Sequence, residues 1–82
     1  MALKKKGVRT DIFGDRCRAR IASLSPRLQT VARYIDAHRE SVAEATAIDI
    51  AAATGTSDAT VIRAVQALGF TGLRDLKLTL AE

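Results

Sequence analysis

The sequence predicts an all-α domain, because apolar residues recur at helical spacing in five separate segments and no segment alternates as a strand does. Capping and stop residues stand at the ends of these segments. Hydrophobic residues make up 48% of the chain, and with only two Phe and one Tyr they are mostly small or aliphatic, which suits closely packed helices. The chain of 82 residues is long enough for one domain with a thin core.

The first two helices follow from apolar spacing and a serine–proline pair. The first is expected over 11–24, and its apolar face holds Phe13, Cys17, Ile21 and Leu24. Ser25 and Pro26 predict a new helix start, because serine caps well and proline fits the first helical position. This second helix should extend to about His38 or Arg39. Its apolar face holds Leu28, Val31, Ala32 and Ile35.

A connection is expected over 40–45, with a short turn at 41–43. Thr46 then predicts the N-cap of a third helix, 47–54, with Asp49 three residues on as the partner of a capping box. Gly55 can adopt the left-handed conformation that ends a helix. The third helix is therefore short and well bounded.

Ser57 predicts the N-cap of a fourth helix, which begins at about Asp58. Its apolar residues are Val61, Ala64, Val65 and Leu68. Gly69 should stop this helix, and Phe70 should turn inward as an anchor. Thr71 is expected to cap a fifth helix over 72–81, with leucines on one face.

The segment 47–68 has the spacing of a helix-turn-helix. Ala51 leaves room where two helices cross, Gly55 tolerates the positive φ of a tight turn, and Val61 presses the second helix against the first. We therefore expect a five-helix bundle that contains a helix-turn-helix and is homeodomain-like. The alternative is a plain helical hairpin in another kind of bundle, because alanine, glycine and valine are common residues.

In a helix-turn-helix, the N-terminal end of the second helix meets the base edges of DNA. The residues expected at bases, outside or at the margin of the fourth helix, are Ser57, Asp58, Ala59, Thr60, Arg63 and Gln66. Arg63 suits guanine or a phosphate, Gln66 suits adenine, and Thr60 suits a hydrogen bond or a thymine methyl group. Ser57 and Asp58 also have ordinary explanations, as a cap and as a charge that complements the helix dipole.

Positive charge is concentrated at the start of the chain. Residues 1–20 hold seven of the Lys and Arg residues against two Asp, and the whole chain has a net charge of +4. We expect residues 1–10 to be a disordered basic arm and 11–82 to be the folded domain. Such an arm suits phosphate contact, although a solvated tail is an equal alternative. The residues expected at phosphates are Lys4, Lys5, Lys6, Arg9, Thr56, Ser57 and Lys77.

Composition argues against several other classes of protein. Cys17 and His38 are the single cysteine and histidine, so neither an internal disulfide nor a zinc site with four Cys and His ligands is expected. Cys17 is expected as a small buried hydrophobe. We find no paired-carboxylate or nucleophile–base pattern and predict neither an enzyme nor a cofactor. Because no long apolar run and no signal peptide are found, a cytoplasmic protein is expected.

The sequence resembles the N-terminal domain of the RpiR family of bacterial transcription regulators over about residues 12–82. The most specific stretch is similar to that family's S-x-A-T-V-x-R…L-G-F-x-G…L-K run. It comprises Ser57, Ala59, Thr60, Val61, Arg63, Leu68, Gly69, Phe70, Gly72, Leu76 and Lys77. Ala47, Asp49, Ala64 and Ala67 depart from the usual pattern, which leaves the fold intact and the operator sequence undefined.

The resemblance implies a role beyond what spacing indicates. It implies a regulator of genes for sugar or sugar-phosphate metabolism, with a C-terminal sugar isomerase-like domain that binds a phosphosugar effector and is absent from this chain. We expect binding to double-stranded DNA as a homodimer, because one recognition helix contacts only a few base pairs. The alternative function is a helical protein–protein interaction module that does not contact DNA.

Overall fold

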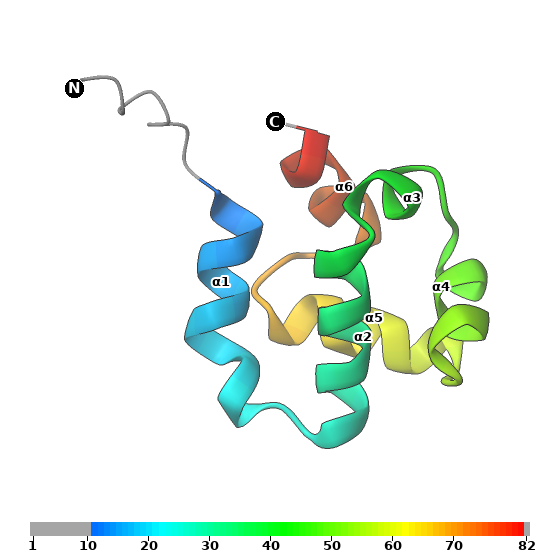
Figure 1. Cartoon of the computed structure of the whole chain (residues 1–82), viewed down its shortest axis with the longest axis horizontal. Coiled ribbons are helices and arrows are strands. Elements are labelled where there is room, and N and C mark those ends of the chain that lie inside the picture. Colours follow the sequence, from blue (N-terminus) through cyan, green and yellow to red (C-terminus); the bar gives the residue numbers. More distant parts are fainter. Residues whose placement is uncertain (1–10, 82) are drawn as a thin grey trace.

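The computed structural model describes residues 11–81, and this part of the chain is all-α, as predicted. Figure 1 shows the elements in chain order. They are α1 (Ile12–Arg20), the 3₁₀ turn η2 (Ile21–Ser23), α2 (Pro26–Ala37), α3 (Arg39–Ala43), α4 (Ala47–Thr54), α5 (Asp58–Ala67) and α6 (Leu73–Ala81). Within 11–81, no helix is both long and apolar enough to cross a membrane.

Three helices begin at the caps that the sequence predicts. The Ser25 hydroxyl accepts the amide of Leu28 at the start of α2. At the start of α4, the Asp49 carboxylate accepts the Thr46 amide at 2.9 Å, and the Thr46 hydroxyl accepts the Asp49 amide at 3.1 Å. Both bonds of the expected capping box are therefore present. Ser57 caps α5 in the same way as Ser25 caps α2.

Two predicted boundaries were wrong. The first α-helix ends at Arg20 rather than near Leu24, because the Ser23 hydroxyl donates a hydrogen bond to the Arg20 carbonyl at 2.8 Å and the chain tightens into η2. The connection predicted over 40–45 contains a helix, α3, so the described residues form six α-helices rather than five. Val42 is fully buried on α3, which packs against α6. That tertiary contact stabilises a helix too short to form alone.

The start of α6 also differs from the prediction. This helix begins at Leu73, and the Gly72 carbonyl accepts its first helical bond, from the Leu76 amide at 3.1 Å. Thr71, the predicted cap, instead donates its backbone amide to the Asp75 carboxylate at 3.0 Å. The predicted cap residue is thus the donor of a bond to Asp75 in the first turn of α6.

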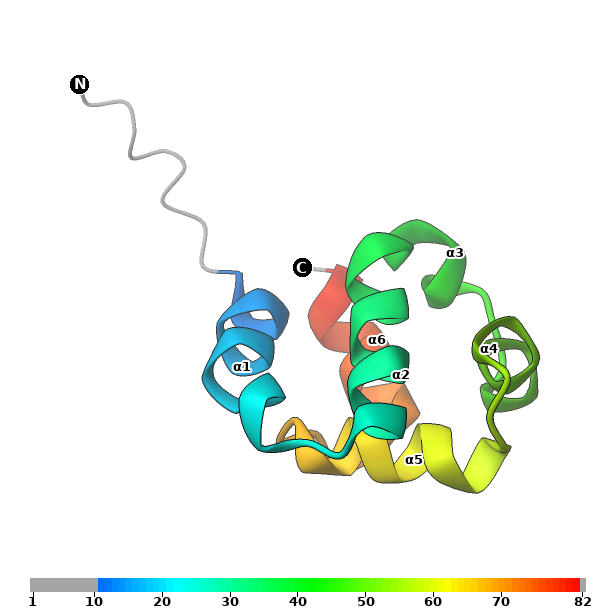
Figure 2. The ribbon, with the colours of Figure 1, turned by 60° about the horizontal axis from the view of Figure 1, so that its bottom comes forward.

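The core forms around α2, which packs against α1, α3, α4 and α5. Figure 2 shows α5 lying across the base of the molecule, below α2, with α4 at one end. The buried hydrophobic residues of the described chain come from every α-helix. They are Phe13, Cys17, Val31, Ala32, Ile35, Val42, Ile50, Ala51, Val61, Ala64, Val65, Leu68, Phe70 and Leu76. Cys17 is a buried hydrophobe as expected, and burial raises the pKa of its thiol.

Two arginines fasten α1 to the rest of the bundle. The Phe13 and Phe70 rings stack with centroids 6.1 Å apart. The Arg39 guanidinium lies 5.2 Å from the centroid of Phe13, and that of Arg16 lies 4.7 Å from the centroid of Phe70. Each cation therefore covers one outer side of the aromatic pair. Phe70, predicted as an inward anchor, is held in this stack.

Hydrogen bonds fix both ends of the same stack. Arg39 donates to both carboxylate oxygens of Asp11, at 2.9 and 3.2 Å, and also to Asp36. The bonds from Arg39 and from the Gly14 amide hold the pKa of Asp11 below its ordinary value. Arg16 donates to the Gly69 carbonyl at 2.8 Å. Thus α1 is attached at its start to the α2–α3 junction and at its middle to the α5–α6 corner.

Candidate nucleic-acid interface

The corner between α4 and α5 has the geometry that the sequence predicted. Gly55 adopts φ 71° and ψ 29°, which is the left-handed region. Its amide and that of Thr56 both donate to the Ala51 carbonyl, the latter at 2.9 Å. A Cβ at Gly55 would meet nothing within 4 Å, so an L side chain there is opposed by backbone conformation alone, at roughly 1–2 kcal/mol. The chain therefore turns sharply between the two helices.

Small and aliphatic residues fill the crossing of these helices. Ala51 and Ile50 of α4 are buried, and Val61 of α5 is fully buried. The other inward residues of α5, Ala64, Val65 and Leu68, are fully buried too. The arrangement of Ala51, Gly55 and Val61 is thus that of a helix-turn-helix, with α5 in the position of the recognition helix.

The outward side of α5 carries most of the residues expected there. Asp58, Ala59, Arg63 and Gln66 are exposed, as is the cap residue Ser57. The Asp58 carboxylate accepts the Ala59 amide at 2.9 Å and so lies against the start of its own helix. That position complements the positive end of the helix dipole, which is the ordinary explanation given above for Asp58.

The position of Thr60 differs from the prediction, which placed it outside or at the margin of the helix. Its exposed fraction is only 4%, and it is not on the outer side of α5. Its hydroxyl lies 3.0 Å from the Ser57 hydroxyl, while the Thr60 amide donates to Ser57 at 3.2 Å. Thr60 is on the edge of α5 that faces α2. The buried side of α5 is therefore wider than its apolar residues alone suggest. Thr60 therefore supports the cap, and its side chain is buried rather than exposed on the outer side of α5.

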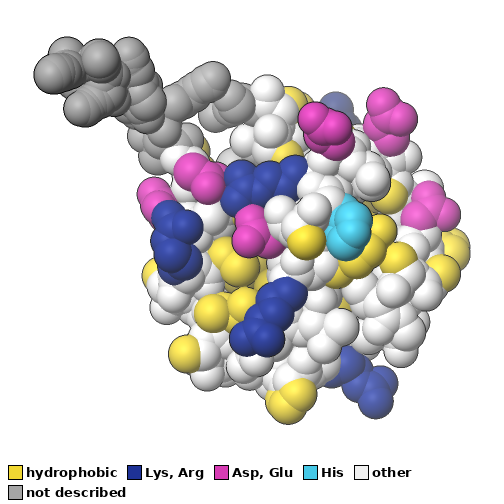
Figure 3. All heavy atoms as spheres, viewed as in Figure 1, with side chains coloured by type: hydrophobic (Ala, Val, Ile, Leu, Met, Phe, Trp, Pro, Cys, Tyr) yellow, Lys and Arg dark blue, Asp and Glu magenta, His cyan; other side chains and the backbone are white. Residues whose placement is uncertain are grey.

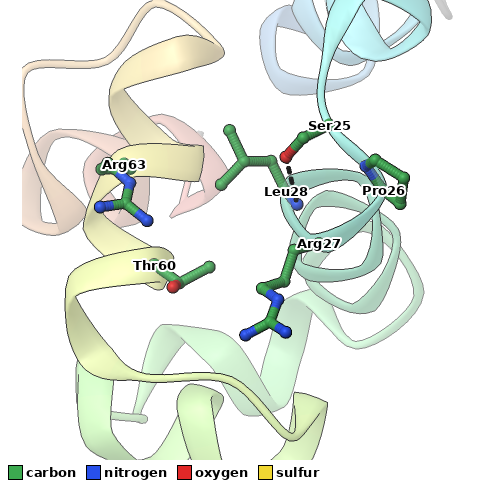
Figure 4. Close-up of a pocket in the computed structure, with 6 residues that line it drawn as sticks. All are labelled: Ser25, Pro26, Arg27, Leu28, Thr60 and Arg63. Atoms are coloured by element: carbon green, nitrogen blue, oxygen red, sulfur yellow. Dashed lines mark hydrogen bonds between the residues drawn. The ribbon is translucent and has the colours of Figure 1, made fainter.

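A hollow of about 420 Å³ lies between the start of α2 and α5. Its lining residues are Ser25, Pro26, Arg27, Leu28, Thr60 and Arg63. Figure 4 shows Arg27 and Arg63 on opposite sides of it, with Thr60 and Leu28 between them. Sequence analysis missed Arg27, because it lies outside the helix-turn-helix segment. The signal that was available is its place directly after the Ser25–Pro26 helix start.

A second hollow, of about 380 Å³, lies on the α4 side of the recognition helix. Its lining residues are Ile48, Ala51, Ala52, Thr56, Ser57 and Asp58. Thr56 and Ser57, predicted at phosphates, are therefore together at the start of α5. Ile48 is unusually exposed for its size, at 69%.

The other residues predicted at phosphates are elsewhere. Lys77 lies on α6 and lines neither of these two hollows. Its charge acts on Asp49, whose pKa is lowered mainly by the backbone and side-chain hydrogen bonds to Thr46. The arm residues Lys4, Lys5, Lys6 and Arg9 lie outside the described residues.

Acidic side chains are unevenly distributed over the molecule. In Figure 3 they lie in the upper half of the visible face, beside basic side chains, whereas the lower half shows basic side chains alone. The ion pairs found within 11–81 are Arg18–Asp15, Arg39–Asp11 and Arg39–Asp36, all on the side of α1 and the α2–α3 junction. Among the described residues, Arg27 and Arg63 form no ion pair, so both charges remain available to an outside anion.

Comparison with known families agrees with this geometry. The model of the family described as "Helix-turn-helix domain, rpiR family" matches residues 15–82, most of the chain. The chain belongs to the RpiR family of helix-turn-helix domains. This RpiR-family domain is therefore a DNA-binding domain of the helix-turn-helix type, and the resemblance drawn from residues 57–77 is confirmed.

The RpiR-family domain is also similar to a curated bacterial protein. It is 41% identical over 58 residues to an uncharacterised HTH-type transcriptional regulator, YbbH, of Bacillus subtilis (strain 168). The match covers 71% of this chain and only 20% of the length of that relative. No solved structure matched the chain.

The inward position of Thr60 gives a prediction about stability. Thr60→Val keeps the shape of the side chain and removes its bond to Ser57, so the free energy of unfolding should fall by about 1 kcal/mol. Chemical denaturation measures this, with Thr30→Val as the control, since Thr30 is exposed on α2 and bonds only to its own helix. Unchanged stability together with weaker DNA binding would return Thr60 to the base-contacting set.

Proposed function

We propose that this RpiR-family domain recognises duplex DNA by sequence, with α5 in the major groove. The exposed Arg63 carries the DNA-binding part of this proposal, and the other exposed residues of α5 carry the sequence recognition. Arg63 projects from a helix whose opposite side is fully buried and whose start is fixed by the Gly55 corner. A recognition helix held in this way presents its N-terminal half to base edges. The interaction-module alternative requires no cation at this position.

The proposed contacts follow from the exposed residues of α5. Gln66 suits the paired donor and acceptor of adenine, and the Ala59 methyl group suits a thymine methyl. Asp58 suits the amino group of cytosine where its bond to the Ala59 amide opens. Amides at the Ser57 cap suit a phosphate, as helix starts generally do. Arg63 suits either a base or a phosphate.

Arg63→Ala tests the proposal. Affinity for a sequence chosen by binding-site selection should fall by about 1–3 kcal/mol, because an exposed arginine contact is lost, while the melting temperature changes little. Titration of a labelled duplex measures the affinity. Arg74→Ala is the matched control, because Arg74 is an exposed arginine on α6. Equal binding by the wild type and Arg63→Ala would remove Arg63 from the interface.

The basic arm gives a separate prediction. We propose that residues 1–10 contact phosphates through Lys4, Lys5, Lys6 and Arg9. A chain lacking these residues should bind every duplex less tightly, and its affinity should depend less steeply on salt concentration. Titrations at several salt concentrations measure both effects. The phosphate role is disproved if the shortened chain keeps the affinity and the salt dependence of the whole chain.

We also propose that the domain acts as a homodimer, with α6 in the subunit contact. Leu78 of α6 is 61% exposed, and the neighbouring Leu80 is only partly buried. A second copy at a two-fold-related half-site would extend the few base pairs that one α5 contacts. Sedimentation with and without DNA should show two copies, and Leu78→Glu should give one. Only monomer in the wild type under both conditions would contradict this prediction.

The match to a much longer transcriptional regulator supports a wider proposal. We propose that the domain is the N-terminal part of a regulator of sugar or sugar-phosphate metabolism. A C-terminal sugar isomerase-like domain would bind the phosphosugar effector, as the family resemblance implies. The coding sequence after Glu82 and the genes beside it check this directly.

A further inference from the structure

The hollow between α2 and α5 has a feature that base contact by α5 does not explain. Two guanidinium groups from helices far apart in the sequence line one hollow, and its lining contains no carboxylate. Arg27 comes from the first turn of α2, and Arg63 comes from the middle of α5. Two like charges that share a hollow repel one another unless an anion lies between them.

The place of Arg27 on α2 is itself electrostatically unfavourable. The start of a helix carries partial positive charge and favours acidic side chains, yet the first turn of α2 has Arg27 and no acidic residue. The first turns of α3 and α6 also hold an arginine, but every other α-helix of the described chain has an acidic residue there, and α2 alone has none. These residues are Asp15, Glu40, Asp49, Asp58 and Asp75. A local departure of this kind is expected at functional positions.

The rest of the lining adds one free donor at most to the two arginines. The Thr60 hydroxyl pairs with that of Ser57, and Pro26 and Leu28 are apolar. The Ser25 hydroxyl accepts the Leu28 amide and keeps its own O–H to donate. Guanidinium groups bind phosphate through paired, charge-assisted hydrogen bonds. The hollow also lies beside the outward side of the recognition helix, where a DNA strand would pass.

We propose that Arg27 and Arg63 together hold one backbone phosphate of the DNA strand that runs beside α5. This inference rests on the proposed entry of α5 into the major groove, and it assigns Arg63 to a phosphate instead of a base. The shared phosphate fixes the position of α5 in the groove, and Gln66, Ala59 and Asp58 are left to distinguish bases. A free phosphate ion would accept the same hydrogen bonds as a DNA backbone phosphate, so the test distinguishes these two ligands.

The test uses the whole 82-residue chain and a mixed-sequence duplex of about 20 base pairs, titrated between 50 and 200 mM salt. Arg27→Ala combined with Arg63→Ala should lower the slope of log affinity against log salt by about one, because a shared phosphate counts once and is lost only when both arginines are removed. The ratio of wild-type to double-variant affinity should therefore shrink by about 3.5-fold across this range. Arg33→Ala is the matched control, because Arg33 is an exposed arginine of α2 that does not line the hollow. It should leave the slope unchanged.

The double variant tests whether one phosphate is shared. If it is, Arg27→Ala combined with Arg63→Ala should weaken binding by less than the product of the two single effects. Each variant should also weaken selected and mixed sequences by the same factor, since a phosphate carries no sequence information. A slope that falls by about one in each single variant, which means two separate phosphates, or strictly multiplicative effects on affinity, overturns the shared phosphate.

A titration with inorganic phosphate alone shows whether the hollow binds a DNA phosphate or a free phosphate ion. Sodium phosphate should shift the Thr60 amide resonance of the wild type only weakly and without saturation at millimolar concentrations. Saturable binding that depends on Arg27, together with an unchanged DNA salt slope, would assign the hollow to a free phosphate and overturn the DNA assignment. If the wild type binds no duplex at any salt concentration, the proposed function itself fails. If the wild type binds duplex DNA and replacing Arg27 changes neither the affinity nor the salt dependence, this inference alone fails.

Discussion

The left-handed conformation of Gly55 is the constraint on which the rest of the DNA-binding surface depends. It brings the amides of Gly55 and Thr56 to one carbonyl, that of Ala51, and turns the chain sharply between α4 and α5. The small side chain of Ala51 then allows α4 and α5 to cross closely, with Val61 between them. Because that crossing fixes the rotation of α5, it also decides that Arg63 and Gln66 face outward.

The second support of α5 is α2, and it acts on the opposite edge of the same helix. Val61, Val65 and Leu68 are fully buried, and burial of such side chains contributes roughly 1.5–3 kcal/mol each. With two helices against it, α5 has little freedom to rotate or slide. The same packing buries Thr60 and places Arg27 across a hollow from Arg63. The packing of α2 against α5 therefore both supports the recognition helix and sets the positions of the two arginines.

The outer helices are held by a different kind of interaction. Arg39, Phe13, Phe70 and Arg16 form one continuous stack of two cations around two aromatic rings. This stack joins α1 to the α2–α3 junction and to the corner that follows α5, so it encloses the thin core of a small domain. It also uses the guanidinium groups of Arg16 and Arg39 internally. Among the described residues, Arg27 and Arg63 form no such internal ion pair, so their charges remain available to an outside anion.

The sequence by itself determined the features set by neighbouring residues. The caps at Ser25, Thr46 and Ser57 and the turn at Gly55 each depend on residues within about four positions, so local chemistry specifies them. Only the tertiary structure decided the inward position of Thr60, the helix around Val42 and the place of Arg27 across a hollow from Arg63. These depend on helices distant in the chain, whose side-by-side packing no local pattern encodes.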